Sequence, residues 1–226
     1  MKGVEMDLYE VMRTTFAARD FTDDPVPDAV IHRILDNARF AASGGNRQGW
    51  RVIVIREPAT REAMAEMMMP AYQRYYAQLR AGESPWNTVH PTRLSDEEIS
   101  ATDAPPDFIR RLVQAPVLLL VLVDLSVVAS FDAQLPRVGV ISGASIYPFV
   151  WNILLAARNE GLGGTPTTFI AAREEELRAL LGFPEHLAVA ALVPLGRPVK
   201  QLTRLSRKPV ASFAMKECWN GPPLES

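Results

Sequence analysis

The sequence predicts one mixed α and β domain in which helices and strands are interleaved. Three apolar runs have the length and composition of buried strands, at 50–55, 115–123 and 187–196. Segments with helical spacing of apolar residues separate these runs. The chain has 226 residues and is 48% hydrophobic, which suits one domain with a substantial core.

The first half of the chain predicts two helices and a strand. Apolar residues at helical spacing predict a first helix over 7–18. A second helix follows Pro25 and Pro27, with Asp28 as its expected N-cap and one apolar face. The run "WRVIVI" at 50–55 is β-branched and apolar on both parities, so we expect a strand.

The second half predicts further helices and two buried strands. Residues 59–82 are helical in pattern and rich in Met and Tyr, and a Pro-, Ser- and Asp-rich stretch over 83–107 has the length of a functional lid or insertion. After the strand at 117–123, the segment "YPFVWNILLAARNEGLGG" is apolar on nearly all sides, which predicts a central buried helix ending at Gly161. A short amphipathic helix, "EEELRALLGF", precedes the last strand, "LAVAALVPLG".

Composition excludes several classes of partner and site. A formal net charge of −2 gives no electrostatic argument for nucleic acid or an anionic membrane. The single cysteine, Cys218, cannot form an intramolecular disulfide or a zinc site alone. We find no signal-peptide pattern, and the longest apolar run is far shorter than the roughly 20 residues that span a bilayer. We therefore expect a cytoplasmic protein.

The usual catalytic motifs are missing, whereas arginines occur near both ends. The sequence contains no phosphate-binding glycine loop, nucleophile elbow or metal-ligand cluster, and its three histidines are scattered. "MRTTFAAR" offers Arg13, Thr15 and Arg19, and "TRLSRKP" offers Arg207 with neighbouring hydroxyl and basic residues. Guanidinium groups beside hydroxyls suit a phosphate dianion, although such arginines are also common as solvated surface charges.

Two glycine-containing turns carry the groups that a flavin ring requires. In "ASGGNRQGW", Asn46 and Gln48 can match the alternating donors and acceptors on one edge of an isoalloxazine, and Gly44 and Gly45 permit close approach of the backbone. In "EGLGGTPTTF", a second glycine turn can face the ring centre. Together with a phosphate grip, these turns predict bound flavin mononucleotide (FMN).

The same segments resemble the nitroreductase family of FMN-dependent oxidoreductases. The similarity lies in the phosphate segment, the "PVP" turn and helix, the polar corner, the helix "WNILLAARNEGLG" and the segment "LTRLSRKPV". These occur in the family's order over nearly the whole chain except about 65–112. The resemblance implies an α+β, three-layer fold, with a mostly antiparallel sheet flanked by helices, in an intertwined homodimer. It also implies one domain over 1–226, a lid or insert at about 65–112, and a tail from about 198 that packs on the partner subunit.

The resemblance assigns the cofactor contacts residue by residue. Arg19 and Arg207 correspond to contacts with the FMN phosphate, assisted by Arg13 and Thr15. The polar corner corresponds to contacts made from the partner subunit, and the second glycine turn to backbone near flavin N5. The implied set is Arg13, Thr15, Arg19, Ser43, Gly44, Gly45, Asn46, Gln48, Gly163, Gly164, Thr165, Pro166, Thr167 and Arg207.

The sequence departs from the family pattern at three places. Thr15–Phe16–Ala17 stands where the family has Arg-Arg-Ser. Ala42 and Gly49 replace two prolines of the corner. The basic group near flavin N1 and O2 has three candidates, Arg47, Arg51 and Arg74.

The expected activity is electron transfer by a ping-pong mechanism. NADH or NADPH reduces FMN at N5 and leaves, and a small electron-poor acceptor such as a nitroaromatic, a quinone or a flavin takes its place. No side chain is required as a catalytic acid or base, and no metal is expected. The aromatic and Met residues of the insert either cover the substrate or pack a core or interface; the two are equally favoured. The set is Met67, Met68, Met69, Tyr72, Tyr75, Tyr76 and Trp86.

Three other functions fit the sequence less well. The same scaffold could carry different FMN chemistry, such as reductive dehalogenation, flavin destruction or azoline oxidation. A flavin-binding protein without catalysis, and an α/β interaction domain without flavin, are the other two. Steady turnover of a nitroaromatic with NADH or NADPH would argue against the first alternative. Bound FMN that NAD(P)H fails to bleach would indicate the second, and no absorbance near 450 nm after addition of FMN would indicate the third.

Overall fold

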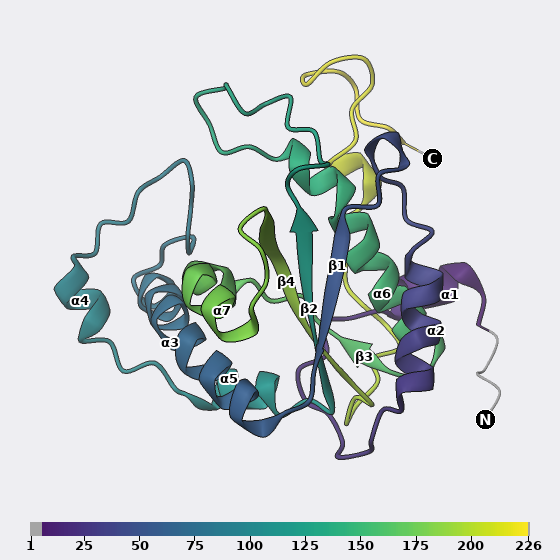
Figure 1. The fold of residues 1–226 in the computed structure, drawn as a ribbon. Helices are drawn as coiled ribbons and strands as arrows, with labels where there is room; N and C mark the ends of the chain where they lie inside the picture. The colour runs from purple at the N-terminus through teal and green to yellow at the C-terminus, as the bar shows by residue number, and fades with distance from the viewer. Residues whose placement is uncertain (1–5, 226) are drawn as a thin grey trace.

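A four-stranded antiparallel sheet forms the centre of the molecule in the computed structural model, which describes residues 6–225. The strands lie in the order β1-β2-β4-β3 (Figure 1). Their bounds are Trp50–Ile55 for β1, Val117–Asp124 for β2, Gly163–Gly164 for β3 and Leu187–Gly196 for β4. The three long apolar runs therefore form the three long strands, as predicted.

A hydrophobic core lies on each face of the sheet, and the central strand β2 contributes side chains to both cores. All eight of its residues are buried. Because successive side chains of a strand point to opposite faces, Val117, Leu119 and Val121 pack in one core and Leu118 and Leu120 in the other. A strand apolar on both parities is thus the one covered on both faces.

One helical layer covers the face of Val117 and Leu119. It contains α1 (Leu8–Thr14), α2 (Asp28–Ala38) and α6 (Tyr147–Asn159), to the right of the sheet in Figure 1. Phe149 of α6 stacks on Trp50 of β1 with ring centroids 4.8 Å apart, and Ile34 of α2 and Ile153 of α6 are completely buried. At roughly 25 cal/mol per Å² of apolar surface, such burial is the main stabilising contribution.

The opposite layer contains α3 (Pro58–Arg80), α5 (Asp107–Val113) and α7 (Glu174–Leu181). Met64, Met68 and Leu177 of this layer are completely buried against the sheet. A short helix, α4 (Asp96–Ser100), lies farther out and begins with a capping box between Ser95 and Glu98. The three-layer arrangement with an antiparallel sheet confirms the predicted fold class.

Four short 3-10 helices lie in the connections: η1 (Gly44–Asn46), η2 (Ile141–Ser145), η3 (Phe169–Arg173) and η4 (Val210–Ser212). Beyond β4, the chain bonds back to the N-terminal segment, where Val199 N–H donates to Asp20 O and Gln201 Nε2 donates to Thr14 O. No helix within residues 6–225 is long and apolar enough to cross a membrane.

The predicted helix over 7–18 is too long at its C-terminal end. The structure ends α1 at Thr14, and residues 15–18 are extended, with Ala17 forming a parallel bridge to Gly164. The helical spacing of apolar residues continues past Thr14 in the sequence because Ala18 is buried. Ala18 is buried by its backbone pairing with Gly164, however, and not by a helix. The cap prediction at Asp28 is also wrong: Pro27 is the N-cap, and Asp28 forms an ion pair with Arg56.

The helix α6 is only partly the buried helix that its composition predicted. Its glycine stop is confirmed, since Gly161 has φ +76° and Leu162 N–H donates to Ala157 O. Tyr147 and Trp151, one turn apart, are 50% and 45% exposed on the single chain. Composition cannot distinguish a helix buried within one chain from one with an exposed aromatic face.

Candidate active site

The N-terminal segment and the second glycine turn are joined by backbone pairing. Ala18 N–H donates to Gly164 O at 3.1 Å, and the bridge between Ala17 and Gly164 continues this contact. Arg158 of α6 holds the preceding turn, because its Nε donates to Thr14 Oγ1 at 2.9 Å. Two segments that are far apart in the sequence, and that were predicted to bind one cofactor, therefore lie side by side.

Gly164 is required by the packing at this junction. A Cβ atom on Gly164 would lie 2.6 Å from Pro194 O and would also overlap the Leu195 side chain. The turn that follows is anchored by a pair of hydrogen bonds between Thr167 and Leu192, each 2.8 Å long. The backbone from Gly163 to Thr167 is thus fixed against β4, which gives it a rigid position.

A cavity of about 900 Å³ opens beside this turn. Its floor is the segment from Thr165 to Phe169, and Arg19 lies on its wall. The opposite wall comes from α3 and the loop that follows it, including Tyr72, Tyr75 and Trp86. The cavity therefore contacts both the predicted cofactor turn and the predicted insert.

The two interpretations of the aromatic insert each hold for part of it. Met68 is completely buried, and Met67 and Met69 pack against the same core. Tyr72, Tyr75, Tyr76 and Trp86 line the cavity, and the three tyrosines also contact this core. Burial, with a smaller contribution from the neighbouring Tyr76, raises the pKa of the Tyr72 phenol, so this hydroxyl is protonated at neutral pH and can donate a hydrogen bond.

The polar corner forms the second candidate region. Ser43 Oγ accepts a hydrogen bond from Gln48 N–H, and Gly44 N–H donates to Ser145 Oγ in η2. Asn46 and Gln48 have φ values of +53° and +51°, a left-handed conformation that is uncommon for residues other than glycine. Local strain of this kind is concentrated at binding sites.

The side chains of the corner leave one amide donor and one amide acceptor available. Gln48 Nε2 donates to Asn46 Oδ1 at 3.1 Å. Asn46 Nδ2 and Gln48 Oε1 have no hydrogen-bond partner among residues 6–225, and both residues are exposed. An amide donor and an amide acceptor match the edge of a flavin pyrimidine ring, which presents the complementary pair.

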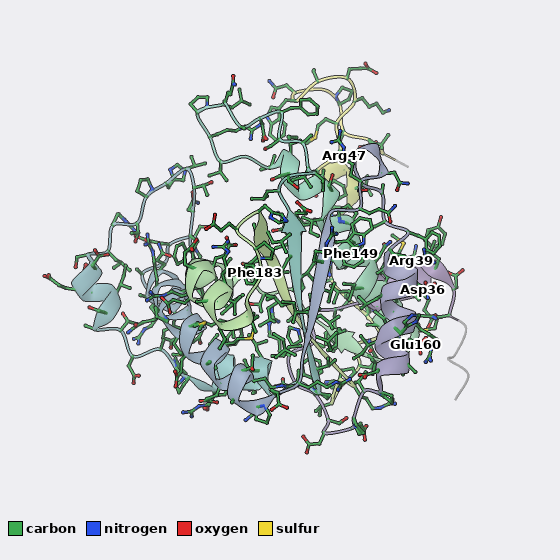
Figure 2. The ribbon with its side chains drawn as sticks, in the orientation of Figure 1. Asp36, Arg39, Arg47, Phe149, Glu160 and Phe183 are labelled. Carbon is green, nitrogen blue, oxygen red and sulfur yellow. The ribbon has the colours of Figure 1, made fainter. Side chains whose placement is uncertain are left out.

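The corner and the glycine turn lie at opposite ends of the sheet. Gly163 pairs with Gly196, at the C-terminal end of β4. The corner leads into Trp50, which pairs with Val123 of β2, and Val123 pairs in turn with Ala188, near the N-terminal end of β4. Eight residues of strand separate these levels, which is about 26 Å at roughly 3.3 Å per residue. Figure 1 shows β3 toward the lower end of the sheet, and Figure 2 shows Arg47, in the corner, at the upper end. Thr167, at the other end of the turn, pairs with Leu192 and is therefore nearer, only about 13 Å along the strand from the level of the corner. The Gly163 end of the turn is thus too far away to share one flavin ring with the corner of the same chain.

The predicted phosphate residues are present but not gathered around one point. Arg13 lies over the Tyr9 ring, Arg19 Nη1 donates to Ala17 O, and Arg207 Nη1 donates to Ser206 O. None of these arginines forms an ion pair with a carboxylate of the described chain. The hydroxyl of Thr15 is buried and donates to Val11 O within its own helix, so in this structure it is not directed at a ligand.

The three candidates for a cation near flavin N1 and O2 occupy different regions. Arg47 donates to Val127 O and Arg51 pairs with Asp124 at 3.6 Å, and both belong to the corner. A hydrogen bond from Ser126 is the main cause that lowers the pKa of Asp124, which keeps this carboxylate charged opposite Arg51. Arg74 lies on α3, with its guanidinium 4.6 Å from the centroid of the Trp86 ring.

Two aromatic residues of the cavity were not identified from the sequence. Phe108 stacks on Tyr72 at 5.0 Å, and Phe169 meets the same ring edge-on at 5.8 Å. Phe169 follows the glycine turn directly, and this adjacency was the one available signal. Phe108 had none, because its place depends on how α5 packs against α3.

Comparison with known proteins gives a family match over most of the chain. The model of the nitroreductase family matches residues 12–197. An NADH dehydrogenase from Thermus thermophilus is 30% identical over 81% of this chain and 82% of its own length. An iodotyrosine deiodinase from Nematostella vectensis is 27% identical over 93% of this chain and 75% of its own length.

A solved structure shows the same fold. Oxidised iodotyrosine deiodinase bound to FMN and 3-iodo-L-tyrosine superimposes with a TM-score of 0.64, covering 90% of this chain and 96% of that one. The two sequences are 22% identical, so this likeness concerns the fold alone.

Proposed function

The chain belongs to the nitroreductase family, and from that premise we propose that it is an FMN-dependent oxidoreductase that passes electrons from NADH or NADPH to an electron-poor aromatic acceptor. The observation that carries the proposal is the junction of Arg19 and the turn from Gly163 to Thr167 at one wall of the cavity. These segments were expected to hold one cofactor, and the backbone pairs them.

The residues present suit FMN in two respects. Arg13, Arg19 and Arg207 have no carboxylate partner among the described residues, so they are available to a phosphate dianion. The free amide pair of Asn46 and Gln48 suits the pyrimidine edge of the ring. When bound, FMN supplies the hydride chemistry at N5, and the protein binds and orients it.

We propose that two copies of the chain complete each site. The corner of one copy and the cavity of the other would contact the same flavin, because within one chain the strand register separates the corner from the glycine turn by about 13 Å at Thr167 and about 26 Å at Gly163. Exposed aromatic residues support an extensive interface between copies: Trp151 is 45% exposed, and Phe213 and Trp219 of the tail are 66% and 86% exposed. The tail from about residue 198 is proposed to pack on the partner.

Reductive dehalogenation is the second candidate function. It is favoured by the relatives named iodotyrosine deiodinase, of which the Nematostella protein matches 93% of this chain. The balanced reaction converts 3-iodotyrosine and NAD(P)H into tyrosine, iodide and NAD(P)⁺. Release of iodide from 3-iodo-L-tyrosine would identify this activity.

Absorbance spectra of the purified protein test the primary proposal. We expect added FMN to bind, and NADH or NADPH to bleach the band near 450 nm without oxygen (a general property of flavins). Addition of a quinone should restore the band, since quinone, NAD(P)H and one proton give hydroquinone and NAD(P)⁺. A protein that binds FMN but is not bleached by either nucleotide would be a non-catalytic flavin protein.

A further inference from the structure

The walls of the cavity are aromatic and hydroxylic. Tyr72 and Trp86 contribute flat faces, and Phe108 and Phe169 close the cavity behind them. The hydroxyls of the tyrosines and of Thr168 provide hydrogen-bonding groups. A planar ring with oxygen substituents fits such walls, because aromatic faces stack on it and hydroxyls can donate to its oxygens.

The charge around the cavity is one-sided. Arg19 is the charged side chain on its wall, and no Asp or Glu occurs among the described residues that line it. A second cation, Arg74, lies over the Trp86 ring at 4.6 Å and forms no ion pair with a described carboxylate. Its Nε atom is buried without a hydrogen-bond partner in the described chain. A bound ammonium group would lose water and meet no carboxylate of these residues, and Arg74 would oppose it; Arg19 adds nothing to this opposition, because the proposed function pairs it with the FMN phosphate.

Trp86 is held in place as part of the wall. Its φ is +52°, a strained conformation for a tryptophan, and its N–H donates to Oε1 of the buried Gln78 at 3.0 Å. Its indole Nε1 donates to Ala71 O at 3.3 Å. These two bonds, with the Arg74 stack, fix the ring against α3. Arg74 lies over one face of this ring.

We propose that this cavity is the acceptor site, that Trp86 is a specificity-determining residue in its wall, and that the site takes planar aromatic acceptors without an ammonium group. This inference rests on the proposed function and narrows its substrate class. It predicts that amino-acid zwitterions, including 3-iodo-L-tyrosine, are poor ligands, despite the deiodinase relatives.

A set of matched nitroarenes tests the charge rule. The probes are 4-nitrobenzyl alcohol, 4-nitrobenzylamine and 4-nitro-L-phenylalanine, at pH 7 and without NAD(P)H, so that binding is measured and no turnover occurs. Nitroarenes quench tryptophan fluorescence, which gives the dissociation constant. We expect the alcohol to bind at least about tenfold more tightly than either ammonium-bearing probe. In Trp86→Phe, the quenching by the alcohol should decrease sharply, which locates the probe in the cavity.

Addition of the missing carboxylate should reverse the selection. Leu79 lines the cavity at its edge and is 48% exposed, so Leu79→Glu places a carboxylate there with little risk to folding. We expect the preference for the alcohol over the amine to fall at least about threefold. Leu79→Gln, which has the shape of glutamate without its charge, and Val89→Glu, in the loop after α3 but not lining the cavity, should both retain the wild-type preference.

The outcomes separate this inference from the proposed function. Equal affinity for the alcohol and the amine, or quenching that is unchanged in Trp86→Phe, would overturn the inference even if FMN is bleached by NAD(P)H. Failure to bind FMN would overturn the proposed function, while the affinity ranking still tests the cavity by itself.

Discussion

At the scale of single residues, Arg207 offers a direct test of the proposed phosphate contact. It is exposed and forms no ion pair with a described carboxylate, so its removal should have little effect on folding. Arg207→Ala should weaken FMN binding by about 1.5–3 kcal/mol, because a charge-assisted hydrogen bond is lost. Titration of the apoprotein with FMN measures this change. Arg80→Ala, another exposed arginine without an ion pair in the described chain, serves as the control, and equal affinities in the two variants would remove Arg207 from the site.

Asp132 predicts a pH dependence of stability. Its Oδ2 accepts from Val140 N–H at 2.7 Å and from Arg137 Nη1 at 2.8 Å, and these bonds lower the pKa of its carboxyl to about 2. Because this pKa is lower in the folded state than its usual value of 3.8, the carboxylate stabilises the fold fully above about pH 4. That contribution is lost progressively as the pH falls from about 4 to about 2.

The measurement is urea unfolding between pH 2 and pH 6. Asp132→Asn should lower stability at pH 6 and flatten the decline below pH 4 relative to wild type. Asp23→Asn, at an exposed aspartate without a hydrogen-bond partner in the described structure, should follow the wild-type curve. A wild-type slope in Asp132→Asn would contradict the assignment.

At the scale of elements, Arg61 joins α3 to the ends of β1 and α5. Its Nη1 donates to Val113 O and Ala115 O, and its Nη2 donates to Ile55 O and Pro116 O, at 2.5–3.2 Å. Burial lowers the pKa of this guanidinium, but an arginine remains charged at neutral pH. The side chain thus satisfies four carbonyl groups where three elements meet.

Replacement of Arg61 by methionine should destabilise the protein by about 2–4 kcal/mol, because these carbonyls lose charge-assisted donors in a partly buried place. Chemical denaturation measures the free energy of unfolding. Arg80→Met, at the exposed end of the same helix, should change it by less than about 0.5 kcal/mol. Similar losses in both variants would show that the hydrogen bonds of Arg61 contribute little.

At the scale of the whole molecule, the proposed dimer makes a specific complementation prediction. A chain with Asn46→Ala and Gln48→Ala lacks a working corner, and a chain with Arg13→Ala and Arg19→Ala lacks a working cavity side. Each homodimer should bind FMN poorly. In the mixed dimer, one site takes its corner and its cavity side from the two altered halves and is therefore doubly defective. The other site takes its corner from the chain with an unchanged corner and its cavity side from the chain with an unchanged cavity side, so it is intact. Co-expression should therefore restore FMN binding to one site per mixed dimer.

Differently tagged chains allow the mixed dimer to be purified, and the flavin absorbance per dimer gives the number of sites. Restoration in the mixed dimer, but not in either homodimer, is expected only if two copies form each site. A mixed dimer that remains colourless, or a wild-type protein that is monomeric by light scattering, would contradict the proposal.

The sequence by itself determined the strands and the two cofactor-like turns. The apolar run 117–123 indicated a doubly covered strand, because burial on both faces favours apolar residues on both parities. The run 50–55 has the same pattern but is only partly buried, with Val54 42% exposed. Gly163–Gly164 and the amide corner were identifiable because unusual backbone conformation and paired amides leave a local mark in the sequence. The end of α1 was not, because residues 15–18 become extended through pairing with a segment nearly 150 residues away.

Only the tertiary structure decided which of these features lie together. It placed Arg19 beside the glycine turn, assigned the insert methionines to the core and its tyrosines to the cavity, and added Phe108 and Phe169. It also separated the amide corner from the Gly163 end of the glycine turn by nearly the length of β4. Local patterns record the conformation and burial of each segment, whereas the distance between segments is set by strand register and layer packing, which no single stretch of sequence contains.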